Sequence, residues 1–259
     1  MQDSFECARY ANLPRPFPDS AVGRSHRLSK EDINALPLFH YSGEITLVRS
    51  REELDHALTR LVRKDGAHAP ILGNGTRQTV LGFDTETLPS FRKGISHSPS
   101  LIQMALEDEV FLFHVKWMPF DRNIIDILEA PDIIKTGVAV HDDMAFLSKI
   151  ETFVPSSVVD LGNVAKKNNM ENHGLRGLAA AFLGLRISKG EQCSNWGSGN
   201  LTPRQIRYAA TDAWISRAVY LRMLEAGLDV SPEPARPQPK SNGSGHKRVT
   251  INKRPQLRT

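Results

Sequence analysis

The pattern of apolar and polar residues predicts six strands and five helices between residues 45 and 227. The strand candidates are apolar or alternating runs bounded by polar turns, at residues 45–48, 79–86, 101–106, 110–115, 133–140 and 158–161. The helix candidates carry apolar stripes or terminal signals and begin after residue 50, at 123, near 142, at 174 and at 202. A hairpin followed by alternating helices and strands predicts an α/β fold, a mixed sheet with helices packed against its faces.

Particular residues mark where several of these helices begin and end. Ser50 with Glu53 three positions later forms a capping box, which starts a helix. Thr202 before Pro203 is a favourable N-cap and first-turn pair, and it opens a helix that runs to about residue 225. Gly184 is placed to end the helix predicted at 174–183.

Composition divides the chain into three segments. Residues 1–44 have three closely spaced prolines and little apolar periodicity, which predicts an extended N-terminal arm. Residues 45–227 hold the periodic pattern and form the predicted folded domain. Residues 228–259 are rich in proline, serine, glycine and basic residues, so we expect a flexible basic tail.

The positive charge of the chain is concentrated in that tail. The whole sequence has 33 basic and 29 acidic residues, a net charge of +4. Residues 235–259 hold seven Lys and Arg and no acid, which leaves a net charge of −3 for residues 1–234. A basic tail suits a polyanionic partner, and a solubilising linker is the alternative.

Cysteine content and hydropathy exclude other classes of protein. Cys7 and Cys193 are too few for a disulfide framework or a cysteine-rich zinc site. No apolar run approaches the ~18 residues of a membrane-spanning helix, and the N-terminus lacks the apolar core of a secretory signal. We therefore expect a soluble, cytoplasmic protein.

Two acidic residues share one face of a predicted strand. Asp84 and Glu86 are two positions apart, so their side chains leave the same side of the sheet. Gly82 lies on that side too and leaves room beside them. Carboxylates this close resist joint ionisation unless a cation lies between them. The alternative is a strand that runs out into a polar turn.

Further acids lie at a strand end and within the long C-terminal helix. Asp142 and Asp143 follow the strand predicted at 133–140, where one of the two can cap the next helix. Tyr208 and Asp212 are four positions apart, so they share one helix face, although a simple surface contact is the alternative. Four carboxylates without a zinc-type pattern favour Mg²⁺ or Mn²⁺, and two such ions about 3.5–4 Å apart suit displacement at phosphorus.

These acidic segments resemble a known family. Residues 83–86 (FDTE), 137–147 and 208–213 (YAATDA) resemble, in this order, the three motifs of the DEDDy class of 3′–5′ exonucleases, within the DnaQ-like superfamily. Residues 101–105 (LIQMA) and 189–196 (KGEQCSNW) are similar to the Werner syndrome exonuclease domain and ribonuclease D. The resemblance covers roughly residues 45–226.

The resemblance implies a ribonuclease-H-like fold and release of nucleoside monophosphates from a nucleic acid 3′ end by two divalent ions. It implies that Asp84 bridges both ions, that Glu86 and Asp212 hold one, and that Asp143 holds the other. It also implies that Tyr208 orients the attacking water. Single-stranded RNA and DNA are both candidate substrates, because no motif encodes recognition of a 2′-hydroxyl.

Other residues near the motifs are further candidates, and most of them have two interpretations. Thr85, Lys189 and Trp196 are candidate substrate contacts, whereas a solvated loop lysine and a core tryptophan are the alternatives for the last two. Asp142 is the expected helix cap beside Asp143, and Asp160 either supports the site or caps a helix.

Two other functions compete with the exonuclease reading. A non-catalytic nucleic-acid-binding module could use the same fold, although all five expected side chains are present. A phosphomonoesterase could use the same metals on a small molecule. Stepwise degradation from a free 3′ end distinguishes the exonuclease from both.

Overall fold

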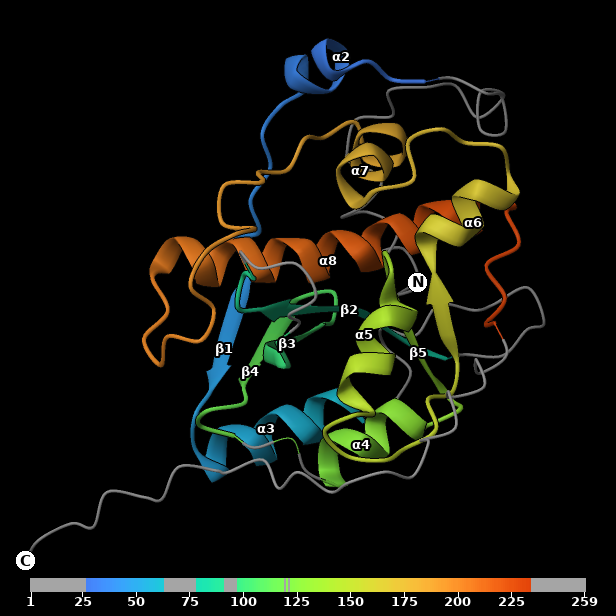
Figure 1. The fold of residues 1–259 in the computed structure, drawn as a ribbon. Helices are drawn as coiled ribbons and strands as arrows, with labels where there is room; N and C mark the ends of the chain where they lie inside the picture. The colour runs from blue at the N-terminus through green and yellow to red at the C-terminus, as the bar shows by residue number, and fades with distance from the viewer. Residues whose placement is uncertain (1–26, 63–77, 91–96, 119, 121, 234–259) are drawn as a thin grey trace, which may run out of the picture.

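The computed structural model describes residues 27–62, 78–90, 97–118, 120 and 122–233. The strands of these residues form one mixed sheet in the order β1-β4-β3-β2-β5-β6 (Figure 1). They are β1 (Glu44–Val48), β2 (Thr79–Thr87), β3 (Pro99–Ala105), β4 (Glu109–His114), β5 (Ile133–Gly137) and β6 (Val158–Asp160). Only β3 runs against its neighbours, because β2, β3 and β4 are joined antiparallel while every other pair is parallel.

Helices cover both faces of this sheet. The described helices are α2 (Lys30–Ala35), which packs on α7 and not on the sheet, α3 (Arg51–Leu61), α4 (Arg122–Glu129), α5 (Val140–Leu147), α6 (Leu161–Lys167), α7 (Leu175–Leu183) and α8 (Pro203–Glu225). Helices α3, α4 and α5 pack on one face, whereas α8 lies across the other with α6 and α7 (Figure 1). The predicted α/β architecture is confirmed, and it is a ribonuclease-H-like arrangement.

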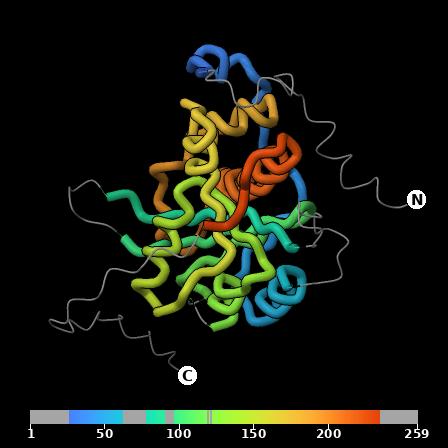
Figure 2. The backbone as a smooth tube through the Cα atoms, turned by 90° about the vertical axis from the view of Figure 1, so that its right-hand side faces the viewer, coloured from blue at the N-terminus to red at the C-terminus, as the bar shows by residue number. Residues whose placement is uncertain are grey.

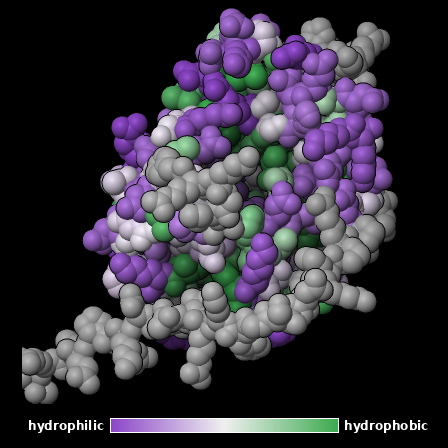
Figure 3. All heavy atoms as spheres, viewed as in Figure 1, coloured by the Kyte–Doolittle hydropathy of each residue, from purple (hydrophilic) through white to green (hydrophobic). Residues whose placement is uncertain are grey.

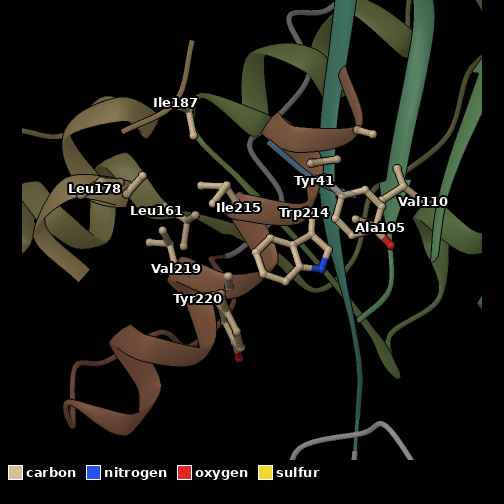
Figure 4. Close-up of a cluster of buried hydrophobic side chains, with 14 of the residues drawn as sticks. Tyr41, Ala105, Val110, Leu161, Leu178, Ile187, Trp214, Ile215, Val219 and Tyr220 are labelled. Atoms are coloured by element: carbon tan, nitrogen blue, oxygen red, sulfur yellow. The ribbon is translucent and has the colours of Figure 1, made fainter. Parts of the chain in front are cut away.

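Each face of the sheet has its own hydrophobic core. Consecutive residues of a strand point to opposite sides, so Val80 belongs to the core under α8 and Leu81 to the core under α3 and α4. Figure 4 shows the first core, where Trp214, Ile215 and Val219 of α8 lie among side chains from several other elements. The central sheet is thus held from both sides.

The predicted helix starts at Ser50 and Thr202 are confirmed. Ser50 accepts a hydrogen bond from the backbone of Glu53, whose carboxylate accepts one from the Ser50 backbone. Thr202 and Gln205 form the same reciprocal box at the start of α8. Gln205 also donates to Ser194 Oγ at 2.7 Å, which ties the loop before α8 to the helix that carries Tyr208 and Asp212.

Gly82 lets α8 approach the sheet at the middle of β2. A Cβ atom at this position would lie 1.9 Å from the carbonyl oxygen of Ala213 and 2.9 Å from its carbonyl carbon. Both atoms belong to the helix backbone, so no side-chain rotation relieves the overlap. The close approach brings the acids of β2 next to those of α8.

We expect Gly82→Ala to destabilise the protein by about 3 kcal/mol, since overpacking costs ~1–3 kcal/mol and here the obstacle is backbone. For a domain of this size that corresponds to a fall in Tm of roughly 6–12 °C. Thermal unfolding of Gly174→Ala is the control, because a Cβ there meets nothing within 4 Å. Equal melting temperatures for the two variants would contradict the close-approach argument.

Strand β5 ends and α5 begins earlier than predicted. The strand stops at Gly137, where a Cβ would lie 2.3 Å from the Phe83 carbonyl oxygen, and Ala139 then takes a left-handed conformation (φ 60°). Helix α5 starts at Val140, and its N-cap residue, Ala139, makes no side-chain cap hydrogen bond. The prediction that Asp142 caps this helix was therefore wrong, because Asp142 lies inside the first turn.

A short helix that the sequence pattern missed follows β6. The predicted strand at 158–161 ends at Asp160, whose carboxylate accepts hydrogen bonds from the backbone of Gly162 (2.9 Å) and Asn163 (3.2 Å). Asp160 therefore caps α6, as one of its two readings predicted.

The expectation of an extended N-terminal arm needs a correction. Residues 1–26 lie outside the described residues, but α2 forms directly after them. Ser29 and Asp32 form a capping box, and Ile33 packs with Ala180 of α7. Figures 1 and 2 both show α2 beside α7. A helix with a single buried residue has too short an apolar pattern to be recognised from sequence.

The chain after α2 runs along α7 and α8. The Phe39 backbone donates to the Arg186 carbonyl at 2.9 Å, and the Tyr41 backbone donates to Thr211 Oγ1 at 3.0 Å. The Phe39 ring stacks on Trp214 with centroids 5.2 Å apart. This segment therefore belongs to the folded body rather than to a free arm.

Hydrophilic residues dominate the visible surface of the protein. Figure 3 shows hydrophilic residues over most of one face, with smaller hydrophobic areas between them. Among the described residues, no helix has the length and apolarity needed to cross a membrane. The basic residues 235–259 lie outside the described part of the chain.

Candidate active site

Asp84 and Glu86 lie on β2, the strand between β3 and β5. Both side chains leave the face that α8 covers, because alternate residues of a strand share a side and Gly82 meets α8 there. Glu86 has an exposed fraction of 8%, and Asp84 is partly buried. The predicted shared face is thus an interior surface of the protein, and a polar surface turn is excluded.

Helix α8 brings a third carboxylate to this pair. Asp212 is 7% exposed and lies one turn after Tyr208, which is 9% exposed. Carboxylate oxygens of Asp84, Glu86 and Asp212 all lie within 4.8 Å of one another. Residues that are more than a hundred positions apart in the sequence therefore form one compact cluster.

Asp143 lies outside the 4.8 Å cluster, on α5 at the opposite face of the sheet, and is tied to β2 through Thr85. It lies in the first turn of α5, where Thr85 Oγ1 donates a 2.6 Å hydrogen bond to Asp143 Oδ1. The negative charge of Asp84 contributes to the raised pKa of Asp143. Thr85 lies between Asp84 and Glu86 on β2 and points to α5, so it positions Asp143 directly.

Burial and mutual repulsion disfavour ionisation of all four acids in the absence of a cation. Burial raises the pKa of Asp84 to about 7, and burial together with the charge of Asp84 raises the pKa of Glu86 to about 10. The pKa values of Asp143 and Asp212 lie well above the ordinary range of aspartate for the same two reasons. A bound cation would reverse both effects.

The donor set fits a hard divalent cation. Asp212 Oδ1 is buried and has no hydrogen-bond partner among the described residues. An acceptor left in this state is costly unless a ligand completes it. The ligands available are carboxylate oxygens, the kind that Mg²⁺ and Mn²⁺ prefer. We conclude that the cluster suits a divalent metal ion.

Tyr208 is held as a neutral phenol beside the cluster. Burial, the charges of Asp212 and Glu86, and a hydrogen bond with Asp212 raise the pKa of its hydroxyl above the ordinary value. The ring packs on Trp196, with centroids 6.0 Å apart. The hydroxyl can therefore donate or accept a hydrogen bond but does not carry a negative charge at neutral pH.

The prediction that Trp196 contacts substrate is corrected by its burial. Its side chain is fully inside the protein, at 0% exposure, so no face of the ring is free to stack on a base. The alternative reading, core packing, is the one observed, and the residue supports the ring of Tyr208. Lys189 is exposed, and its positive charge acts on Asp212 and opposes the rise in that pKa.

A cavity of about 670 Å³ opens over the cluster. Four of the five predicted catalytic residues line it, namely Asp84, Glu86, Tyr208 and Asp212, together with the candidate substrate contacts Thr85 and Lys189. Its other side is formed by α2 and the start of α7, including Lys30, Asn34 and Arg176. Sequence reasoning missed Lys30 and Asn34 because no motif connects a short N-terminal helix to a site 50 residues further along, and it missed Arg176 of α7 because no motif includes that residue.

Comparisons with known proteins agree with this geometry. A family model described as 3′-5′ exonuclease matches residues 54–227. The mouse bifunctional 3′-5′ exonuclease/ATP-dependent helicase WRN is 33% identical over 157 residues, which cover 57% of this chain but only 11% of that protein.

Solved structures of two nucleases share the fold. The Nibbler EXO domain of Aedes aegypti has a TM-score of 0.59 at 22% identity, covering 78% of this chain and 92% of that one. Escherichia coli RNase D, an exoribonuclease, has a TM-score of 0.59 at 19% identity, covering 71% and 45%. With the family match spanning all three acidic motifs, this chain belongs to the 3′–5′ exonuclease family of the DnaQ-like superfamily, as the resemblance predicted.

Proposed function

We propose that this protein is a metal-dependent exonuclease that removes nucleotides one at a time from the 3′ end of single-stranded RNA or DNA. The observation that carries the proposal is the carboxylate cluster of Asp84, Glu86 and Asp212, with oxygens within 4.8 Å, beside a buried neutral tyrosine in a cavity. Membership of the 3′–5′ exonuclease family supports the reaction class.

In this proposal the four acids hold two divalent ions, Mg²⁺ or Mn²⁺. Asp84 would be the shared ligand, since its carboxylate lies within 4.8 Å of those of Glu86 and Asp212 and the next residue, Thr85, holds Asp143. Glu86 and Asp212 would hold one ion with it, and Asp143 would hold the other, as the family resemblance implies. When bound, the ions would activate a water molecule and neutralise the negative charge that develops on the leaving 3′ oxygen.

The protein's own residues orient the reactants around the terminal phosphodiester. The Tyr208 hydroxyl positions the attacking water, and its hydrogen bond with Asp212 holds it at the cluster. The Trp196 ring fixes the phenol from behind. Thr85 holds the Asp143 carboxylate in one orientation through its 2.6 Å hydrogen bond. The products are a nucleoside 5′-monophosphate and a strand shortened by one nucleotide.

A matched pair of DNA and RNA strands of one sequence tests this proposal. We expect a ladder of products shortened from the 3′ end in the presence of Mg²⁺ or Mn²⁺, no cleavage in EDTA, and no cleavage of strands with a blocked 3′ terminus. Binding without cleavage would instead identify a nucleic-acid-binding module. Release of inorganic phosphate from small phosphomonoesters, with intact strands, would identify a phosphomonoesterase.

We expect the metal-free protein to lose stability between pH 5 and pH 7. The folded-state pKa of Asp84 is raised to about 7, whereas that of an unfolded aspartate is about 3.9. Unfolding therefore releases a proton in this window, so the free energy of unfolding falls as the pH rises. Bound Mn²⁺ should abolish the decline, because the carboxylates are then ionised in the folded state.

Thermal unfolding of wild type and Asp84→Asn in EDTA measures this effect. The difference between the two pH profiles gives the contribution of Asp84 to the pH dependence of stability. Burial lowers the pKa of His114 as well, but His114 is present in both proteins, so its effect cancels. Lys135, whose burial lowers its pKa to about 7, titrates near the upper end of this window and is likewise common to both proteins. Parallel profiles would show that Asp84 does not titrate in this range.

A further inference from the structure

The cavity over the carboxylates has a second wall, which no motif of the sequence predicted. It is made by α2 and the first turn of α7, and its polar residues are Lys30, Asn34 and Arg176. We call these three residues the α2–α7 wall. The carboxylates and this wall line the same 670 Å³ cavity, so a ligand held by one can reach the other.

The guanidinium of Arg176 has a hydrogen-bond donor without an acceptor in the described part of the chain. Its Nη2 donates to Asn34 Oδ1, and its Nε is buried without a hydrogen-bond partner among the described residues. Among the described residues, no carboxylate forms an ion pair with Arg176. A guanidinium binds oxyanions through two parallel N–H donors, and the Nε–Nη2 edge is held here by one neutral amide.

The surroundings of Arg176 favour an anion. Lys30 lines the cavity beside it, on the same helix as Asn34. The acid that lines this part of the cavity, Glu171, forms an ion pair with Arg27 at 3.7 Å. The α2–α7 wall is therefore positive on balance, and it lines the same cavity as acids that are largely protonated until cations bind.

Helix α2 is anchored well enough to act as a fixed wall. The Leu28 backbone donates to Asn172 Oδ1 at 2.8 Å, and Asn172 Nδ2 donates back to the Leu28 carbonyl at 3.2 Å. Ile33 packs with Leu28 and Ala180. Asn34 is exposed, so its amide can give up Nη2 to a better acceptor while α2 stays in place.

We propose that Arg176, with Lys30, binds a backbone phosphate of the substrate strand upstream of the scissile phosphodiester. This inference rests on the proposed exonuclease function. The terminal phosphodiester occupies the carboxylate side of the cavity, and the preceding strand passes the α2–α7 wall. The phosphate takes the place of the Asn34 amide oxygen on Nη2 and supplies the acceptor that Nε lacks. Arg176 is a binding residue for the strand and takes no part in bond cleavage.

The test compares two substrates that differ in the presence of an upstream phosphate. One is a short single-stranded oligonucleotide, and the other is the 4-nitrophenyl ester of thymidine 5′-monophosphate, which has one phosphodiester and no strand. The variants are Arg176→Gln and Arg176→Lys. Arg51→Gln is the control, since it removes the same charge from an exposed residue of α3 on the other side of the sheet.

For Arg176→Gln we expect KM for the oligonucleotide to rise roughly tenfold, the scale of one charged hydrogen bond. Its kcat, and both constants for the nitrophenyl ester, should stay within about twofold of wild type. The log–log salt dependence of kcat/KM for the oligonucleotide should flatten by ~0.7, the slope of one phosphate contact on a single strand. Arg176→Lys should keep the salt slope but recover only part of the affinity, because it lacks the fork of donors.

Three results would overturn the inference. An unchanged KM and salt slope in Arg176→Gln would show that the residue does not meet the strand. An equal loss on both substrates would show a structural role, and an equal effect of Arg51→Gln would show a general charge effect. A wild-type protein that cleaves neither substrate would instead overturn the proposed function itself, so the two failures are distinguishable.

Discussion

Replacing Asp84 with asparagine is expected to reduce hydrolysis of a single-stranded oligonucleotide at least about a thousandfold, the scale on which removal of one member of a catalytic unit acts. Asp84 is the carboxylate whose charge acts on the three others, so its loss affects both proposed cation sites. Asparagine keeps the shape of the side chain. The melting temperature without metal should stay the same or rise, because one buried repulsive charge is removed.

The measurement is kcat for oligonucleotide cleavage in saturating Mn²⁺, together with thermal unfolding in EDTA and in Mn²⁺. We expect Mn²⁺ to raise the melting temperature of wild type much more than that of the variant. Asp126→Asn is the matched control, since this acid is exposed on α4 and pairs with Arg122 at 2.7 Å. Turnover above roughly a thousandth of wild type in a pure, folded Asp84→Asn preparation would refute the shared-ligand role.

Tyr208→Phe is expected to lower kcat by ~10²–10⁴, the usual contribution of a positioned acid–base or orienting group. The substitution removes one oxygen atom and keeps the ring that packs on Trp196. Affinity for Mn²⁺ should change little, because the tyrosine is not a proposed ligand. KM for the oligonucleotide should also change little, since the hydroxyl acts on the water and does not bind the strand.

Tyr220 provides the control for this measurement. It lies on the same helix, roughly 18 Å further along at 1.5 Å per residue, and its side chain is 1% exposed. Tyr220→Phe should therefore retain wild-type kcat. If both variants keep full activity, Tyr208 has only a packing role, and if both lose it, the loss reflects disturbance of α8.

The acids of the candidate site could be selected from the sequence because the face on which a side chain lies depends only on residue spacing within one strand or helix. A spacing of two residues on a strand places Asp84 and Glu86 on one face, and a spacing of four residues on a helix places Tyr208 beside Asp212. The carboxylate cluster of Asp84, Glu86 and Asp212 follows that expectation. Their assignment to particular metal ions came from the family resemblance and stays a prediction.

Residues with two readings could not be separated without the tertiary structure. Trp196 and Lys189 lie in the same loop, yet one is fully buried and the other is exposed. Asp142 and Asp143 are neighbours, and a left-handed Ala139 decides that the helix begins before both of them. Burial and chain direction depend on what packs against a segment, which its own residues do not encode.

The sequence by itself determined the order of the six strands and of all the described helices except α2 and α6, the capping boxes at Ser50 and Thr202 and the residues with metal-binding chemistry, because these depend on neighbours within a few positions. Only the tertiary structure decided how close α8 lies to β2 at Gly82, how far burial raises the pKa values of the acids, and which residues complete the cavity. Lys30 and Arg176 are 146 positions apart, and the packing of Ile33 on Ala180 is what brings their helices together. Long-range contacts of this kind arise from the burial of apolar surface, which depends on the whole fold.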